Sequence, residues 1–152
     1  MGLDVKVFQN ITKLSKDAED YDFIASNYKE FKERCQNLEW DAKYKAETKK
    51  RMISYPCSSH NDFRRELAVL IGKERNFWEN PDVPKDVPFY ELFDFADNEG
   101  TIDWESSQNL YNDFVEHKQL ATDKLPVYYL DYYGRWLEVF ELAKNAGVVV
   151  FS

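Results

Sequence analysis

The closing stretch Gly147-Val148-Val149-Val150-Phe151 decides the fold class of this chain. A continuous apolar run rich in β-branched residues is typical of a strand that is covered on both faces. At the opposite end, Leu3, Val5 and Val7 alternate with polar residues, which is the period of a half-buried strand. A strand at each end of the chain predicts that both termini lie in one sheet, where they can pair.

Helical patterns dominate the second half of the chain. A helix is predicted from Ser58 or Ser59, either of which can cap it, to about Ile71, with Gly72 as its terminator. Two further helices are indicated by apolar stripes, formed by Leu110, Tyr111, Phe114 and Val115 and by Trp136, Leu137, Phe140 and Ala143. Together with the terminal strands, this order predicts an α+β domain in which three or more helices pack on one face of a small sheet.

The region from residue 15 to residue 50 leaves two interpretations open. Phe23 to Leu38 suits either a helix or a strand and a turn. The basic run from Lys43 to Arg51 is interpreted as a solvated segment, because acidic neighbours balance it. A short strand is expected at Met52 to Tyr55, where Pro56 would end it.

Composition and charge exclude several classes of protein. The chain has 152 residues, 43% hydrophobic and 16% aromatic, which is enough for one domain over residues 1–152 with a substantial core. A net charge of −8 argues against direct binding of nucleic acid, because phosphate contacts need clustered lysine and arginine. No stretch resembles a membrane span or a signal peptide, and Cys35 and Cys57 lack the spacing of a metal site. We therefore expect a cytoplasmic protein without cofactor or metal.

An acidic loop around Gly100 resembles half of a calcium-binding loop. With Gly100 in the sixth position, Asp97 and Glu99 take the third and fifth positions, and Asp103 the ninth. The first and twelfth positions hold no carboxylate, so the loop alone cannot supply the roughly six to eight oxygens that calcium needs. A glycine turn before a helix capped by Asp103 is the alternative, but it leaves Asp97 and Glu99 without a role.

A second polar cluster lies where the predicted strand meets the predicted helix. The helix start at Ser58, Ser59 and His60 offers backbone N–H groups to an anion, and Arg64 follows one turn later. The alternative is a plain helix cap in which Arg64 pairs with a neighbouring carboxylate. A zinc site would need His60 together with Cys57 or the acidic loop, and the spacing does not support one.

Four segments of the chain resemble a family of small uncharacterised proteins from bacteria and their phages. The matching segments are residues 1–5, residues 54–64 (Ser-Tyr-Pro-Cys-Ser-Ser-His-Asn-Asp-Phe-Arg), residues 95–102 (Phe-Ala-Asp-Asn-Glu-Gly-Thr-Ile) and residues 147–151. The resemblance implies that the serine–histidine–arginine segment and the acidic loop belong to one recurring design. It also implies a phage origin, but it implies no particular activity.

Our leading hypothesis from the sequence is a non-enzymatic binding protein for a small anionic or nucleotide-like ligand, which in a phage would sequester a host defence signal. The expected ligand-binding residues are Tyr55, Ser58, Ser59, His60, Arg64, Asp97, Glu99, Thr101 and Trp104. The first alternative is an acidic inhibitor that binds a basic host protein through surface charge. The second alternative is a small hydrolase that uses Asp97, Glu99 or His60.

Overall fold

The structure is a computed structural model that describes residues 2–25, 34–79, 83–93 and 100–152. Its centre is an antiparallel sheet of five strands in the order β2-β3-β1-β5-β4. The strands are β1 (Gly2–Lys13), β2 (Phe23–Ile24), β3 (Lys43–Pro56), β4 (Gly100–Ile102) and β5 (Gly147–Phe151).

The first and last strands pair directly, which confirms the prediction that both termini lie in the sheet. Their register runs from Val5 opposite Phe151 to Gln9 opposite Gly147. Beyond it, the backbones of Asp4 and Ser152 exchange two hydrogen bonds of 2.8 and 2.9 Å. The chain enters β5 through Gly147, where a Cβ atom would lie 2.7 Å from the Cα atom of Ala143, so only glycine fits without a shift.

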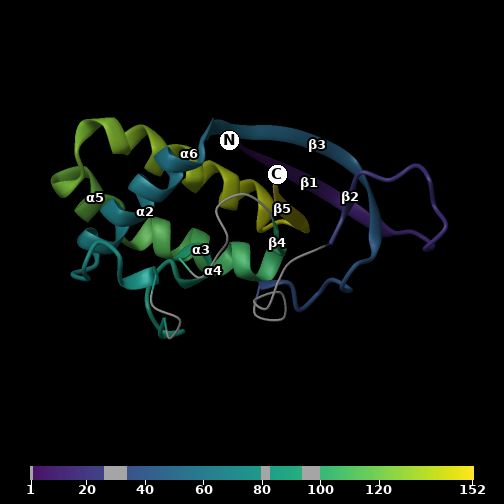
Figure 1. The fold of residues 1–152 in the computed structure, drawn as a ribbon, viewed down its shortest axis with the longest axis horizontal. Helices are drawn as coiled ribbons and strands as arrows, with labels where there is room; N and C mark the ends of the chain where they lie inside the picture. Colours follow the sequence, from purple (N-terminus) through teal and green to yellow (C-terminus); the bar gives the residue numbers. More distant parts are fainter. Residues whose placement is uncertain (1, 26–33, 80–82, 94–99) are drawn as a thin grey trace.

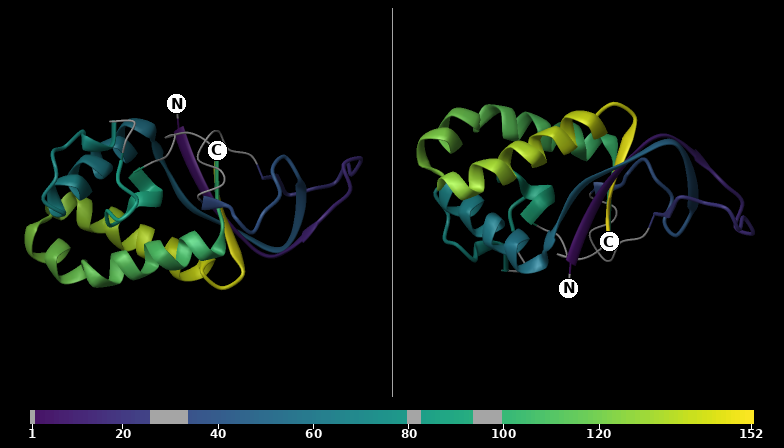
Figure 2. Two further views of the ribbon diagram at one scale, coloured as in Figure 1. Left: turned by 90° about the horizontal axis from the view of Figure 1, so that it is seen from below. Right: turned by 90° about the horizontal axis from the view of Figure 1, so that it is seen from above.

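The helices cover one face of this sheet, so the predicted α+β class is confirmed. They are α2 (Cys57–Leu70), α3 (Tyr90–Phe93), α4 (Trp104–Glu116), α5 (Lys118–Lys124) and α6 (Val127–Ala143), with a 3-10 turn η1 (Phe77–Glu79). Figures 1 and 2 show the helices gathered at one end of the molecule, while β1 and β3 run on beyond them as a long curved ribbon.

Two hydrophobic cores lie on opposite faces of the sheet. The larger core joins the helices to β1, β3 and β5 and includes Trp136, Phe140 and Val149. The smaller core includes Phe8, Phe23, Ala25, Cys35, Leu38, Tyr44 and Val148. Because neighbouring residues of a strand point to opposite faces, Val148 and Val149 enter different cores, and both are fully buried. This explains why β5 needs an uninterrupted apolar run.

Of the two predicted helix caps, one is confirmed and the other is wrong. Asp103 caps α4 as predicted, because its side chain accepts a 3.0 Å hydrogen bond from the Ser106 N–H. Neither serine caps α2: the helix begins at Cys57 after Pro56, without a side-chain cap. The φ of Pro56 is −61°, which suits the entry to a helix, and the helix begins two or three residues earlier than a cap at Ser58 or Ser59 would give. Gly72 follows the end of α2 with φ +77°, as expected of a terminator.

The strand predicted at Met52 to Tyr55 is much longer than expected, while the exposure of residues 47–51 agrees with a solvated basic run. Lys43–Pro56 is a single strand of 14 residues rather than a short strand from Met52. It pairs with β1 from Gly2 opposite Pro56 to Lys13 opposite Tyr44. Its central residues, 47–51, are exposed, so no apolar alternation marks the strand in the sequence. Within Phe23–Leu38, the strand interpretation holds for Phe23 and Ile24, while residues 26–33 lie outside the described residues.

Candidate functional site

The structure brings Tyr55 and His60 together in the large core. Tyr55 lies one residue before the end of β3, and its hydroxyl accepts a 2.7 Å hydrogen bond from the indole N–H of Trp136. The rings of Tyr55 and His60 lie 6.4 Å apart, and burial raises the pKa of Tyr55. Both side chains therefore serve as packed core groups in this structure.

His60 is enclosed by aromatic rings. It is fully buried, with ring centroids 5.4 Å from Trp136 and 6.2 Å from Phe151. Neither ring nitrogen has a hydrogen-bond partner within the described part of the chain. Burial, followed by the nearby charge of Arg64, holds the pKa of His60 well below its ordinary value. The imidazole is therefore neutral and has no contact with solvent.

Ser58 and Ser59 lie at the surface of the same helix end. Ser58 is exposed, whereas Ser59 is half-buried and hydrogen-bonds the hydroxyl of Tyr132. Tyr132 also shares a 3.0 Å hydrogen bond with Tyr128. The start of α2 therefore has the backbone N–H groups of the predicted anion site. Arg64, which was expected to complete that site, does not point toward it.

Arg64 is directed into the protein rather than toward a ligand. The side chain is 2% exposed, and Nη1 donates to the carbonyl oxygens of Phe93 at 3.1 Å and Leu92 at 3.4 Å. Nη2 donates to Asn61 Oδ1 at 2.6 Å, and the guanidinium lies 4.0 Å from the ring centroid of Trp78. A cation at the carboxyl end of a helix is favourable. The role that these contacts indicate is to hold the end of α3 against α2.

Of the ligand-binding residues predicted around the acidic loop, only Thr101 and Trp104 are described, and neither contributes to this cluster. Asp97 and Glu99 lie outside the described residues. Thr101 is buried in β4, and its carbonyl accepts a 2.7 Å hydrogen bond from the Cys35 thiol, whose pKa is raised by burial. Trp104 packs against the small core, on the face of the sheet opposite to Tyr55.

The carboxylate of Asp103 is fully used by protein N–H groups. Besides the cap to Ser106, its Oδ2 accepts from the backbone and side chain of Asn37 at 3.0 and 2.9 Å. No group of three histidine, cysteine or acidic side chains is placed to hold a metal ion within residues 2–25, 34–79, 83–93 and 100–152. Among these residues, the role of Asp103 is therefore that of a cap.

A hollow at the far end of the sheet is the site that the sequence did not reveal. Its volume is about 660 Å³, and it is lined by residues 13–16, Ile24 and residues 39–43. The turn at residues 39–42 is held in place by Ala25, which donates to the Ala42 carbonyl at 2.9 Å and accepts from the Asp41 N–H at 2.8 Å. The backbone N–H of Glu39 donates to the Tyr44 hydroxyl at 3.0 Å. These contacts tie the rim of the hollow to the small core.

The three lysines of this hollow have different roles. Lys43 donates to the carbonyls of Lys16 and Ala18 at 3.0 and 2.7 Å, so it supports the loop after β1. Lys13 pairs with Glu39, which raises the pKa of Lys13 and lowers that of Glu39. The exposed ammonium of Lys16 has no hydrogen bond or ion pair with the residues that the structure describes. Trp40 is 54% exposed beside them, so the hollow offers an indole surface and an available positive charge.

A second, shallower hollow lies between the loop before α3 and helix α4. It has a volume of about 390 Å³, and burial raises the pKa of both Glu91 and Asp113 there. Asp113 accepts the Phe89 N–H at 3.0 Å, so this carboxylate already has a structural role. Its neighbour His117 is half-buried against Phe89, at a centroid distance of 5.3 Å.

The comparisons with known proteins add no assignment to this geometry. No protein-family model, curated protein or solved structure matches the chain. Among the described helices, none has the length and apolarity needed to cross a membrane.

Proposed function

We propose that the protein is a non-enzymatic binding protein for a small, flat, anionic ligand of nucleotide-like chemistry. The observation that carries this proposal is the hollow of about 660 Å³ that combines the exposed Trp40 with the available ammonium of Lys16. Small-molecule sites in proteins typically measure about 300–1,000 Å³ and combine apolar walls with a few polar groups. The hollow fits this description in both size and lining.

Each part of the ligand would meet a different wall of the hollow. A planar base would stack on the Trp40 indole, an interaction of about 1–3 kcal/mol for each base. Leu14 and Ile24 supply apolar contact, and Lys16 supplies the counter-charge for a phosphate. Three lysines and two carboxylates line the hollow, so it is locally positive in a chain whose net charge is −8.

Binding is favoured over catalysis by the groups that line the hollow. Among the described residues around it there is no histidine or cysteine, so the usual bases and nucleophiles are missing there. Glu39 is held in its charged form by Lys13, because the pairing lowers its pKa, and this makes it a poor general acid. In an infected cell, such a protein would sequester a nucleotide-like signal, a step that rests on the phage resemblance.

The test is a calorimetric titration with ADP, adenosine and inorganic phosphate. We expect ADP to bind more tightly than either fragment, because only ADP engages both Trp40 and Lys16. Trp40→Ala and Lys16→Glu should each weaken ADP binding by at least fivefold. The matched controls are Tyr128→Ala and Lys118→Glu, which change an exposed aromatic residue and an exposed lysine on α6 and α5. These controls should stay within twofold of the unaltered protein.

Two results would contradict the proposal. One is equal affinity for ADP in the hollow variants and their controls, which would place any binding elsewhere. The other is the absence of ADP binding at millimolar concentration by a folded protein. Circular dichroism melting curves of all variants establish that each protein is folded.

A further inference from the structure

We infer that the outer edge of β3 at residues 47–51 binds an extended acidic segment of a partner protein, which adds to the sheet as a further strand. We refer to this stretch as the β3 edge. The inference does not depend on the proposed ligand, because none of these residues lines the hollow.

Within the described residues, no strand pairs with the outer side of the β3 edge. On its inner side, β3 pairs with β1 along nearly its whole length. On its outer side, β2 pairs with Lys43 and Tyr44 alone, and the sheet order places no other described strand there. Figure 1 shows β3 running along the top of the molecule, with the short β2 near one end only. A strand edge with unpaired N–H and C=O groups is a template for an added strand.

The side chains of the β3 edge are exposed to solvent. All five residues from Glu47 to Arg51 are exposed, so solvent reaches their side chains on both faces. None of the described helices, and no part of the small core, covers this stretch of the ribbon. The edge is therefore accessible to another chain without any rearrangement of the fold.

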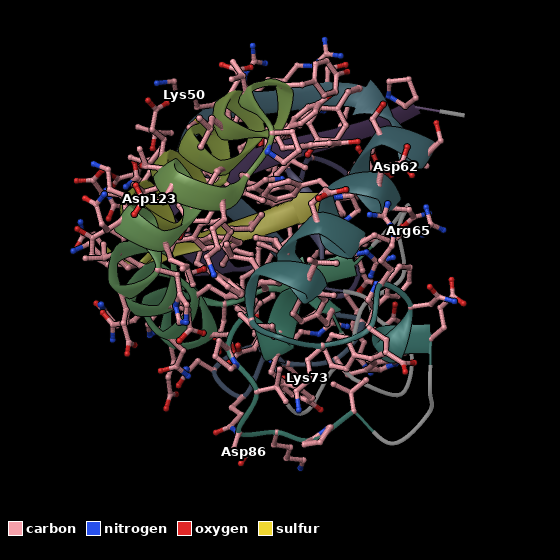
Figure 3. All side chains as sticks on the ribbon, turned by 90° about the vertical axis from the view of Figure 1, so that its left-hand side faces the viewer. Lys50, Asp62, Arg65, Lys73, Asp86 and Asp123 are labelled. Carbon is pink, nitrogen blue, oxygen red and sulfur yellow. The ribbon has the colours of Figure 1, made fainter. Side chains whose placement is uncertain are left out.

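The charge of the β3 edge specifies the kind of partner. Residues 43–51 contain five basic residues and one acidic residue, although the whole chain carries −8. Lys49 and Lys50 have no carboxylate partner within the described part of the chain, and Figure 3 shows Lys50 at the periphery of the molecule. An acidic strand would complement this charge, whereas a second copy of the same edge would be repelled.

Two aspartates of the protein already bind β3 in the way proposed for the partner. Just before β2, Asp22 accepts the backbone N–H of Ala46 through Oδ2 at 2.7 Å, and its own N–H donates to the Tyr44 carbonyl at 2.9 Å. Asp20 pairs with Lys45 at 2.9 Å. An acidic segment of this chain thus already occupies the start of the strand through both backbone and ammonium contacts. The partner segment would repeat the pattern along the β3 edge.

A peptide satisfies this edge better than a nucleic acid does. Ladder pairing needs alternating N–H donors and C=O acceptors at the spacing of a polypeptide, and a phosphodiester backbone has no such donors. Lysine charge alone would not distinguish the two, so the experiment must separate charge from backbone pairing.

The experiment uses a fluorescein-labelled octapeptide of alternating glutamate and valine, followed by fluorescence anisotropy. The full chain should bind it, and Lys49→Glu/Lys50→Glu should weaken binding at least tenfold. The matched control Lys118→Glu/Lys124→Glu makes the same change of charge on α5 and should stay within twofold. A peptide with alternate N-methylated amides keeps its charges but lacks ladder donors, and it should bind at least tenfold more weakly. Hydrogen exchange at residues 47–51 should slow when the unmodified peptide is saturating.

Each other outcome overturns the inference. Equal binding of the N-methylated peptide would mean that charge alone attracts it, without strand addition. Equal loss in both double variants would reduce the effect to net charge. Binding of a single-stranded oligonucleotide but not of the peptide would make the β3 edge a nucleic-acid surface. Trp40→Ala should leave peptide binding unchanged, which separates this inference from the proposed ligand site.

Discussion

At the helical end of the molecule, Arg34 and Arg64 are at most 2% exposed and His60 is completely buried. At the ribbon end, Lys16, Lys49 and Lys50 are exposed, and none has an ionic partner among the described residues. A buried charge must be satisfied by fixed protein groups, because leaving it unpaired costs several kcal/mol. An exposed charge remains available to another molecule. The buried charges at the helical end therefore maintain the fold, while these three exposed lysines at the ribbon end are open to binding.

The two buried arginines show how the helical end satisfies its charge. Arg34 donates to the Glu91 carbonyl at 3.5 Å, and Arg64 donates to the next two carbonyls of the chain. Both guanidiniums therefore contact carbonyls of α3, although the two arginines lie 30 residues apart and both precede this helix in the sequence. This arrangement ties a helix of only four residues to the rest of the protein.

The largest expected effect is a loss of stability in the large core. Phe114 is fully buried, with its ring 4.7 Å from Phe89 and 4.8 Å from Tyr133. Phe114→Ala should lower the free energy of unfolding by about 3–5 kcal/mol, because it leaves a cavity. Urea denaturation measures this change. The neighbouring Val115→Ala, at a residue 48% exposed, should change it by about 0.5 kcal/mol or less. Similar losses in both variants would contradict the division between core and surface.

A smaller loss of stability is expected from Arg64. Arg64→Met should lower the free energy of unfolding by about 2–3 kcal/mol, because it leaves buried carbonyls without their donor. Arg65→Met, which removes a partly exposed arginine paired with Asp62 at 2.7 Å, should cost about 1 kcal/mol or less. Urea denaturation and ADP titration together separate the two hypotheses for Arg64. An unchanged stability with lost ADP binding would restore the predicted anion site and contradict its structural role.

The smallest effect is a pH dependence carried by His60. Its pKa is lowered in the folded protein, whereas the unfolded chain keeps the ordinary value of about 6.5. Below that pH, the unfolded chain takes up a proton that the folded protein does not, so stability falls as the pH falls. The slope for one group is at most about 1.4 kcal/mol for each pH unit.

Thermal melts of the unaltered protein and His60→Leu between neutral pH and pH 5 measure this dependence. The raised pKa values of Glu91 and Asp113 act in the opposite direction, but they are present in both proteins. The difference between the two melting profiles therefore isolates His60. Parallel profiles would show that this imidazole does not remain neutral in the folded protein.

The candidate site was less accessible to sequence reasoning than the fold was. The sequence singles out Arg64, but it does not predict which way the side chain points. The carbonyls that accept its hydrogen bonds lie 28 and 29 residues further along the chain. The sequence does not predict a site at Trp40, because residues 15–50 suit more than one secondary structure. An indole between the charged residues Glu39 and Asp41 was the available signal that this tryptophan is exposed.

The sequence by itself determined the α+β class, the strands at both termini and the cap of α4 by Asp103. These features follow from local periodicity and from hydrogen bonds over a few residues. Both depend only on residues that are close together in the sequence. Only the tertiary structure decided that Lys43–Arg51 joins a strand, that Arg64 turns inward and that a hollow forms beside Trp40. Each of these depends on segments distant in the chain: β1 opposite β3, α3 against α2, and Ala25 holding the turn at residues 39–42.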